Sequence, residues 1–91
     1  MSDIKPYKEI THENCVIRIF EPDADIDDLK WHRDYEDRII TPLNDNDWKY
    51  QEDNKLPVPI KETFSIPMGL WHRVIKGTTR LVIMIEKIKP A

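Results

Sequence analysis

The sequence predicts an all-β protein, built as a small antiparallel barrel or a double-sheet jelly roll. The chain of 91 residues contains two glycines and seven prolines, and its β-branched residues fall in short runs between turn-forming clusters. Such spacing is typical of about seven or eight short antiparallel strands. No segment carries the apolar periodicity of a helix.

A chain of this length forms a single domain, which we divide into an N-terminal edge segment (1–14), a barrel (15–88) and a tail (89–91). At this size folding buries only about 60–65% of the surface of the unfolded chain. The core is therefore thin, and we expect a homodimer interface or a bound metal to stabilise it.

Charge and composition exclude several classes of protein. The net charge is −3 at pH 7 and no basic stretch is longer than two residues, which argues against a nucleic-acid partner. No apolar run reaches the length of a signal peptide or a membrane span. The single cysteine, Cys15, lies in an apolar run, where a buried and reduced thiol is expected. We therefore expect a soluble cytoplasmic protein with no membrane partner.

In the first part of the chain, strands are predicted at residues 4–10, 15–20, 29–35 with a continuation at 38–43, and 48–51. The first is an edge strand because Pro6 has no amide hydrogen to donate to a neighbouring strand. The second is covered on both faces because the residues that point to each of its faces are mostly apolar. The polar turn between the last two strands joins them into a hairpin, with Trp48 and Tyr50 on one face.

In the second part, strands are predicted at residues 56–60, 63–66, 70–76 and 80–88. Two prolines restrict the first of these to a sheet edge. The last is the most apolar strand, and we expect it to be the best buried. Pro67 and Gly69 form a tight turn before the third strand, because proline fixes its own φ and glycine tolerates a positive φ.

The tripeptide Trp-His-Arg occurs twice, at residues 31–33 and 71–73. Period-two alternation places His32 and Asp34 on one face, and an antiparallel fold that brings His72 alongside them would assemble two imidazoles and one carboxylate. Such a set forms the facial triad of non-haem Fe(II) oxygenases, and it would also hold zinc, manganese or nickel. We expect these ligand atoms to lie about 3–4 Å apart around one divalent ion.

With these residues identified, the chain resembles the cupin superfamily over residues 16–88. Pro67, Gly69 and His72 match the second cupin motif, and His32 matches the start of the first. The first motif departs from the pattern at three positions: Asp34 replaces a histidine, Arg38 a glutamate and Asp45 a glycine. The second departs at Lys61 and Lys76. The resemblance implies a single-domain cupin jelly roll. The amino-acid sequence around the first motif is similar to that of very short cupins of marine tailed phages.

Several residues have two interpretations. Arg38 binds an anionic group of a substrate in one and neutralises Asp34, Glu36 or Asp37 in the other. Glu36 is the candidate base or substrate contact closest to it in sequence. The histidines are metal ligands in one interpretation and half-buried residues bonded to the backbone in the other. Trp31 and Trp71 should face away from the cavity, toward a second sheet or a dimer contact.

Three functions remain open. The first is a metal-binding cupin enzyme, a dioxygenase or a metal-dependent isomerase or lyase that acts on a small anionic molecule. The second is a non-catalytic module that binds a small ligand or a protein partner without metal. The third is a purely structural domain.

Overall fold

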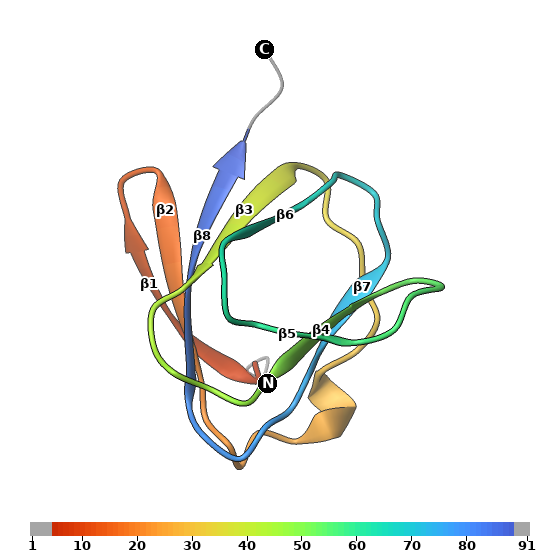
Figure 1. Ribbon diagram of the computed structural model, residues 1–91. Coiled ribbons are helices and arrows are strands. Elements are labelled where there is room, and N and C mark those ends of the chain that lie inside the picture. Colours follow the sequence, from red (N-terminus) through yellow and green to blue (C-terminus); the bar gives the residue numbers. More distant parts are fainter. Residues whose placement is uncertain (1–4, 89–91) are drawn as a thin grey trace, which may run out of the picture.

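The computed structural model describes residues 5–88, which form eight antiparallel strands in two facing sheets and one short 3-10 turn (Figure 1). The strands are β1 (Tyr7–His12), β2 (Cys15–Phe20), β3 (Asp37–Pro42), β4 (Lys49–Glu52), β5 (Val58–Pro59), β6 (Phe64–Ile66), β7 (His72–Ile75) and β8 (Leu81–Ile88). The 3-10 turn, η1, spans Ile26–Asp28. The prediction of an all-β protein with about eight strands is confirmed.

The larger sheet has the strand order β1-β2-β8-β3-β6. The last strand in sequence, β8, lies at its centre and pairs with β2 on one side and β3 on the other. Leu81, Ile83 and Ile85 alternate along it, and each exposes 5% of its surface or less. The prediction that the C-terminal strand is the best buried is therefore confirmed.

The smaller sheet has the order β5-β4-β7, and an isolated bridge between His32 and His72 extends it by one residue pair. β5, which carries one of the two prolines of its predicted strand, occupies the edge as expected. The two sheets enclose one apolar core, made of Phe20, Ile40, Trp48, Tyr50, Ile60, Ile66, Leu81, Ile83 and Ile85. Within residues 5–88 the sheets remain separate and do not close into the barrel that the sequence predicted.

The predicted hairpin of residues 38–43 and 48–51 is wrong, because β3 and β4 belong to different sheets. Residues 44–47 are a crossover, and their side chains bind remote segments of the chain. The Asn44 side chain donates to the carbonyl of Arg80 and accepts from the amide of Val82, whereas Asn46 donates to the carbonyl of Ile60. The turn-forming residues 44–47 therefore connect a strand of one sheet to a strand of the other, and do not close a hairpin.

Asp47 completes the crossover by holding the turn before β8. Its carboxylate accepts from the amides of Thr78 and Thr79 and from both of their hydroxyls. Gly77 lies against it so closely that a Cβ there would come within 2.8 Å of the Asp47 carbonyl carbon. Glycine is required at this position by close packing.

Other boundaries differ from the prediction. Residues 29–35 form no strand beyond the single His32 bridge, because only two backbone hydrogen bonds attach this segment to β7. β1 begins at Tyr7, and it is an edge strand as expected, whereas Ile4 and the tail 89–91 lie outside the described residues. Cys15 is a half-buried free thiol. No helix in residues 5–88 is long and apolar enough to cross a membrane.

Candidate metal centre

The centre lies where the segment before β3 meets the start of β7. His32 and His72 exchange two backbone hydrogen bonds of 3.0 and 2.9 Å, which fixes the two residues opposite each other. The amide of Gly69 donates to the carbonyl of Asp34 at 2.9 Å, so the predicted turn also anchors the third residue. Gly69 has φ +82°, the positive value expected from the sequence.

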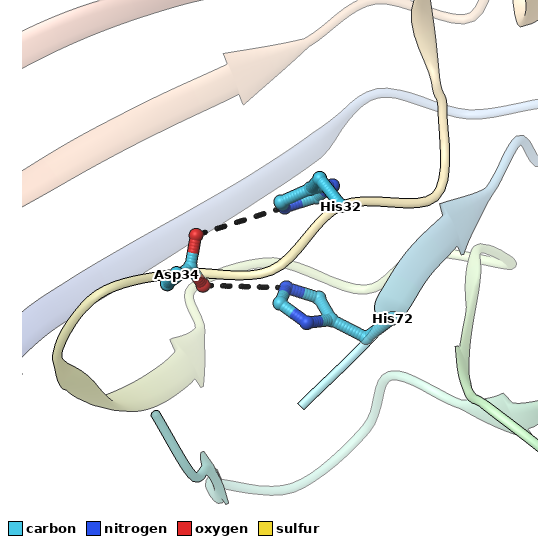
Figure 2. Close-up of side chains that lie close together, drawn as sticks. All are labelled: His32, Asp34 and His72. Carbon is cyan, nitrogen blue, oxygen red and sulfur yellow. Dashed lines mark ion pairs between the residues drawn. The ribbon is translucent and has the colours of Figure 1, made fainter. Parts of the chain in front are cut away.

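The three side chains converge, as Figure 2 shows. The Nε2 atom of His72 is 3.3 Å from Oδ2 of Asp34, and Nε2 of His32 is 3.9 Å from Oδ1. Asp34 and His72 are buried, whereas the His32 side chain is 50% exposed. The ligand atoms all lie within 4.8 Å of one another, an upper limit wider than the expected 3–4 Å. His32, Asp34 and His72 thus form a group that could hold a metal ion.

Backbone carbonyls determine which ring nitrogens are free. Nδ1 of His32 lies 2.9 Å from the carbonyl oxygen of Lys30, and Nδ1 of His72 lies 2.8 Å from that of Leu70. A carbonyl oxygen only accepts hydrogen bonds, so Nδ1 of each ring is the protonated nitrogen. In the neutral form of each ring the lone pair is therefore on Nε2, and both Nε2 atoms face Asp34.

The residues fit a divalent cation. Among the described residues, Asp34 Oδ2 is a buried side-chain oxygen without a hydrogen-bond partner. Its 3.3 Å neighbour, Nε2 of neutral His72, presents a lone pair and cannot donate to it. Two nitrogen lone pairs and an unpartnered carboxylate oxygen directed at the same place need a positive charge among them.

The electrostatics of His72 favour the neutral, metal-binding form. Burial lowers the pKa of His72 below its usual value, because removal from water penalises the charged ring, although the hydrogen bond to Leu70 and the Asp34 carboxylate oppose this effect. A lowered pKa leaves the Nε2 lone pair available at neutral pH.

Arg38 already supplies one positive charge to the centre. Its Nη1 atom lies 3.3 Å from Asp34 Oδ1, and its Nε donates to Glu36 Oε2 at 2.9 Å. The arginine therefore pairs with Asp34 and Glu36, two of the three carboxylates that the sequence suggested. It also lines a cavity beside the centre. Glu36 orients Arg38, and the third candidate carboxylate, Asp37, instead accepts from the amide of Met68.

A cavity of about 400 Å³ opens beside the three side chains. Apolar residues from both sheets form most of its wall, among them Ile40, Phe64 and Val74. Tyr50 is a wall residue whose contact with the centre the sequence analysis missed: its ring lies 5.8 Å from the ring of His72, and its hydroxyl donates to Glu52. Burial raises the pKa of Tyr50, so the phenol stays protonated.

Pairing across the small sheet explains why Tyr50 was missed. Glu52 lies directly opposite His72 in the register of β4 and β7, and Tyr50 is two residues away on the same face. The sequence predicted that Trp48 and Tyr50 share one face of a strand, but it did not predict that His72 lies next to that face.

Solved structures of several other proteins are similar to this fold. A cupin domain from Bordetella pertussis superposes with a TM-score of 0.67 at 18% identity, covering 99% of this chain and 100% of that one. A protein from Neisseria meningitidis gives 0.62 at 14% identity, covering 97% and 89%. A cupin-2 domain containing protein from Shewanella frigidimarina gives 0.61 at 12% identity, covering 97% and 85%. No protein-family model and no curated protein sequence matches the chain.

The protein therefore has the cupin fold, and the predicted resemblance is confirmed at the level of the fold. Within that fold it carries a His-Asp-His group that could bind metal. The likeness to the cupins of tailed phages stays a prediction from the sequence.

Proposed function

We propose that this protein is a metal-binding cupin in which His32, Asp34 and His72 hold one divalent ion. The observation that carries the proposal is the convergence of two Nε2 atoms on a buried carboxylate whose Oδ2 has no hydrogen-bond partner among the described residues. Each ring is already held by a carbonyl at Nδ1, which is the orientation that a metal-ligating histidine needs.

Two imidazoles and one carboxylate favour Fe(II), and manganese, nickel and zinc are the alternatives. Iron would supply oxygen chemistry of the dioxygenase type, whereas a redox-inactive ion would supply the Lewis acidity that an isomerase or a lyase uses. The protein's own contribution is to bind and orient the substrate next to the ion.

We propose a small anionic molecule with an apolar body as the substrate. The protein as a whole carries a net charge of −3, yet the cavity is lined by more cationic than acidic side chains. The cationic ones are Lys5, Arg18, Lys30 and Arg38, and the acidic ones are Asp28 and Asp34. Arg18 already pairs with Glu9, and Arg38 with Asp34 and Glu36. Lys5 and Lys30 therefore carry most of the attraction for an anion. The apolar walls favour an apolar body. Glu36 would act indirectly, by holding Arg38.

The test is the metal content of protein purified without chelators. We expect close to one equivalent of iron, or of manganese, nickel or zinc, by elemental analysis. His72→Ala should lose this metal because it removes a buried ligand, whereas His12→Ala should keep it because His12 lies at the end of β1, outside the metal group and the cavity lining. A wild-type protein that remains metal-free after exposure to each of these ions would contradict the proposal.

The alternative is a non-catalytic module that binds a small ligand or a protein partner without metal. The pairing of Arg38 with Asp34 at 3.3 Å favours it, because the guanidinium supplies the charge that a metal would otherwise supply. This alternative predicts a metal-free wild type together with ligand-dependent thermal shifts in a metabolite screen.

We place the protein in a reducing compartment such as the cytoplasm. Its only cysteine is a half-buried free thiol, in keeping with a fold that uses no disulfide. Localisation of a tagged full-length chain by microscopy or fractionation tests this assignment.

A further inference from the structure

The two Trp-His-Arg tripeptides, similar in sequence and far apart along the chain, pair with each other. His32 and His72 are bridge partners in antiparallel orientation. The neighbours on either side are therefore brought opposite each other, Trp31 to Arg73 and Arg33 to Trp71. The result is a local arrangement in which each tripeptide offers one histidine to the inner face and one Trp and one Arg to the outer face.

On the outer face both cross-strand pairs are in contact. The guanidinium of Arg73 lies 4.7 Å from the centre of the Trp31 ring, and that of Arg33 lies 5.3 Å from the Trp71 ring. Both distances are within the range of cation–π attraction. Trp31 and Trp71 remain 39% and 44% exposed, so they do not belong to the core.

Arg73 is itself held from the other side. Its Nε and Nη2 atoms both donate to Oε1 of Gln51, at 3.0 and 2.8 Å, and Gln51 donates to the carbonyl of Lys55. A row of contacts thus runs across the outer face from Gln51 on β4, through Arg73 on β7, to Trp31. It ends on the segment that carries two of the three residues of the metal centre.

That segment has few other attachments near the centre. Residues 29–36 form no strand. After the 3-10 turn, two backbone hydrogen bonds at His32 and one at Asp34 join them to the rest of the described chain, and the buried Asp34 also pairs with Arg38. The His32 side chain is half exposed, so packing against the His72 ring covers it only in part, and the carbonyl at its Nδ1 belongs to Lys30 of the same segment. The outer-face contacts are the side-chain interactions that flank it on both sides.

We propose that Trp31 and Arg73, supported by Arg33 and Trp71, are positioning residues that hold the His32 imidazole next to His72. The two rings lie 4.3 Å apart, centroid to centroid, on the inner face directly behind the outer pairs. The inference rests on the proposed function only for its consequence, namely that the outer pairs tune metal affinity. The geometric part can be measured in metal-free protein.

The experiment compares the full-length wild type with Trp31→Ala, Arg73→Ala and the conservative variant Trp31→Phe. Arg80→Ala is the matched control, because Arg80 is an exposed arginine with one carboxylate partner, Glu21, and lies outside the cavity lining. In metal-free protein, the NMR cross-peak between the His32 and His72 rings should be strong in wild type and Arg80→Ala. It should be lost in the two alanine variants and retained in Trp31→Phe, which keeps an aromatic face.

A second readout is the dissociation constant for Co²⁺, at a temperature where every variant is folded by circular dichroism. We expect a 10- to 100-fold increase for Trp31→Ala and Arg73→Ala, the size of effect that supporting residues have at metal sites, and no change for Arg80→Ala. An unchanged ring-to-ring cross-peak in both alanine variants would overturn the inference. If the cross-peak is lost while the wild type binds no Co²⁺, the inference stands and the proposed metal function fails.

Discussion

At the scale of single residues, Arg38 brings a positive charge to the candidate metal centre. In the cupin motif that the sequence resembles, this position belongs to a metal-binding glutamate, whereas this chain has a cation there. The structure shows how the cation is accommodated: Arg38 faces Asp34 and Glu36, and both carboxylates are close enough to compensate its charge. Arg38 and a metal ion would therefore share the same carboxylate.

We predict that Arg38→Ala lowers the stability of the metal-free protein and increases its affinity for metal. The change leaves the buried Asp34 carboxylate without its cation, and breaking such a buried pair costs about 3–5 kcal/mol. A divalent ion restores the missing charge. Urea unfolding with EDTA and with Mn²⁺ measures both effects.

The two interpretations of Arg38 differ in how much stability Mn²⁺ restores to the Arg38→Ala variant. If the arginine contacts only substrate, the variant keeps the stability and the metal content of the wild type. Arg80→Ala serves as the control, since its ion pair is exposed at the surface and should contribute little.

At the scale of elements, the crossover 44–47 and the turn before β8 stabilise each other. Asp47 accepts four hydrogen bonds from Thr78 and Thr79, and Trp48 donates from its indole nitrogen to the carbonyl of Thr79 at 2.6 Å. These bonds connect the residues just before β4 of the small sheet to the turn just before β8 of the large sheet. They add a polar link to the apolar contact that the Trp48 ring makes with Phe20 of β2 at the same end.

We predict that Asp47→Asn lowers the melting temperature at pH 7, and that the difference from wild type narrows as the pH falls below 3.8. The hydrogen bonds from Thr78 and Thr79 lower the pKa of Asp47 well below its usual value of 3.8. A group whose folded pKa is lowered contributes stability above its unfolded pKa, and this contribution is lost as the pH falls through the folded pKa. The two proteins should therefore converge progressively below pH 3.8.

Thermal unfolding followed by circular dichroism between pH 2 and pH 7 measures this convergence. Asp45→Asn provides the control, because it makes the same charge change on an exposed residue of the same crossover. A difference between Asp47→Asn and wild type that stays constant over this range would contradict the prediction.

At the scale of the whole molecule, the apolar core is small and the candidate metal centre lies at the end of one sheet, where few backbone hydrogen bonds hold the chain. An ion bound only by the folded state adds its binding free energy to folding. A metal held by His32, Asp34 and His72 would therefore stabilise the folded chain.

We predict that a metal at 100 times its dissociation constant stabilises the protein by about 2.7 kcal/mol. For a domain of this size that corresponds to an increase of about 10–20 °C in melting temperature. The shift should be absent in His72→Ala, which lacks a buried ligand, and retained in His12→Ala. Differential scanning calorimetry with and without metal measures it, and equal shifts in the two variants would indicate binding elsewhere.

We also propose that the protein is a homodimer. β1 and β6 leave the two edges of the large sheet unpaired within the described residues, and Trp31 and Trp71 are large side chains exposed on the outside of the small sheet. Unpaired edges and exposed aromatic surface are commonly covered by a partner. Light scattering at tens of micromolar should give twice the monomer mass of 10.9 kDa. A value equal to the monomer mass at every concentration would rule the dimer out.

The sequence by itself determined the features that depend on neighbouring residues. Short apolar runs bounded by turn-forming residues predicted the bounds of β2 and the buried character of β8. Turn chemistry predicted the positive φ of Gly69, and period-two alternation predicted the outward orientation of Trp31 and Trp71. These properties follow from local backbone sterics and from the apolar pattern, both of which can be read within a few residues.

Tertiary structure decided the features that depend on contacts between remote residues. The assignment of β3 and β4 to different sheets, the pairing of Arg38 with Asp34 and the place of Tyr50 beside His72 all depend on which segments become neighbours. The convergence of His32, Asp34 and His72 was predicted only on the condition that the fold brought two identical tripeptides together. It does so with a single bridge pair in place of a strand, next to which Asp34 is buried and the two outer Trp–Arg pairs are in contact.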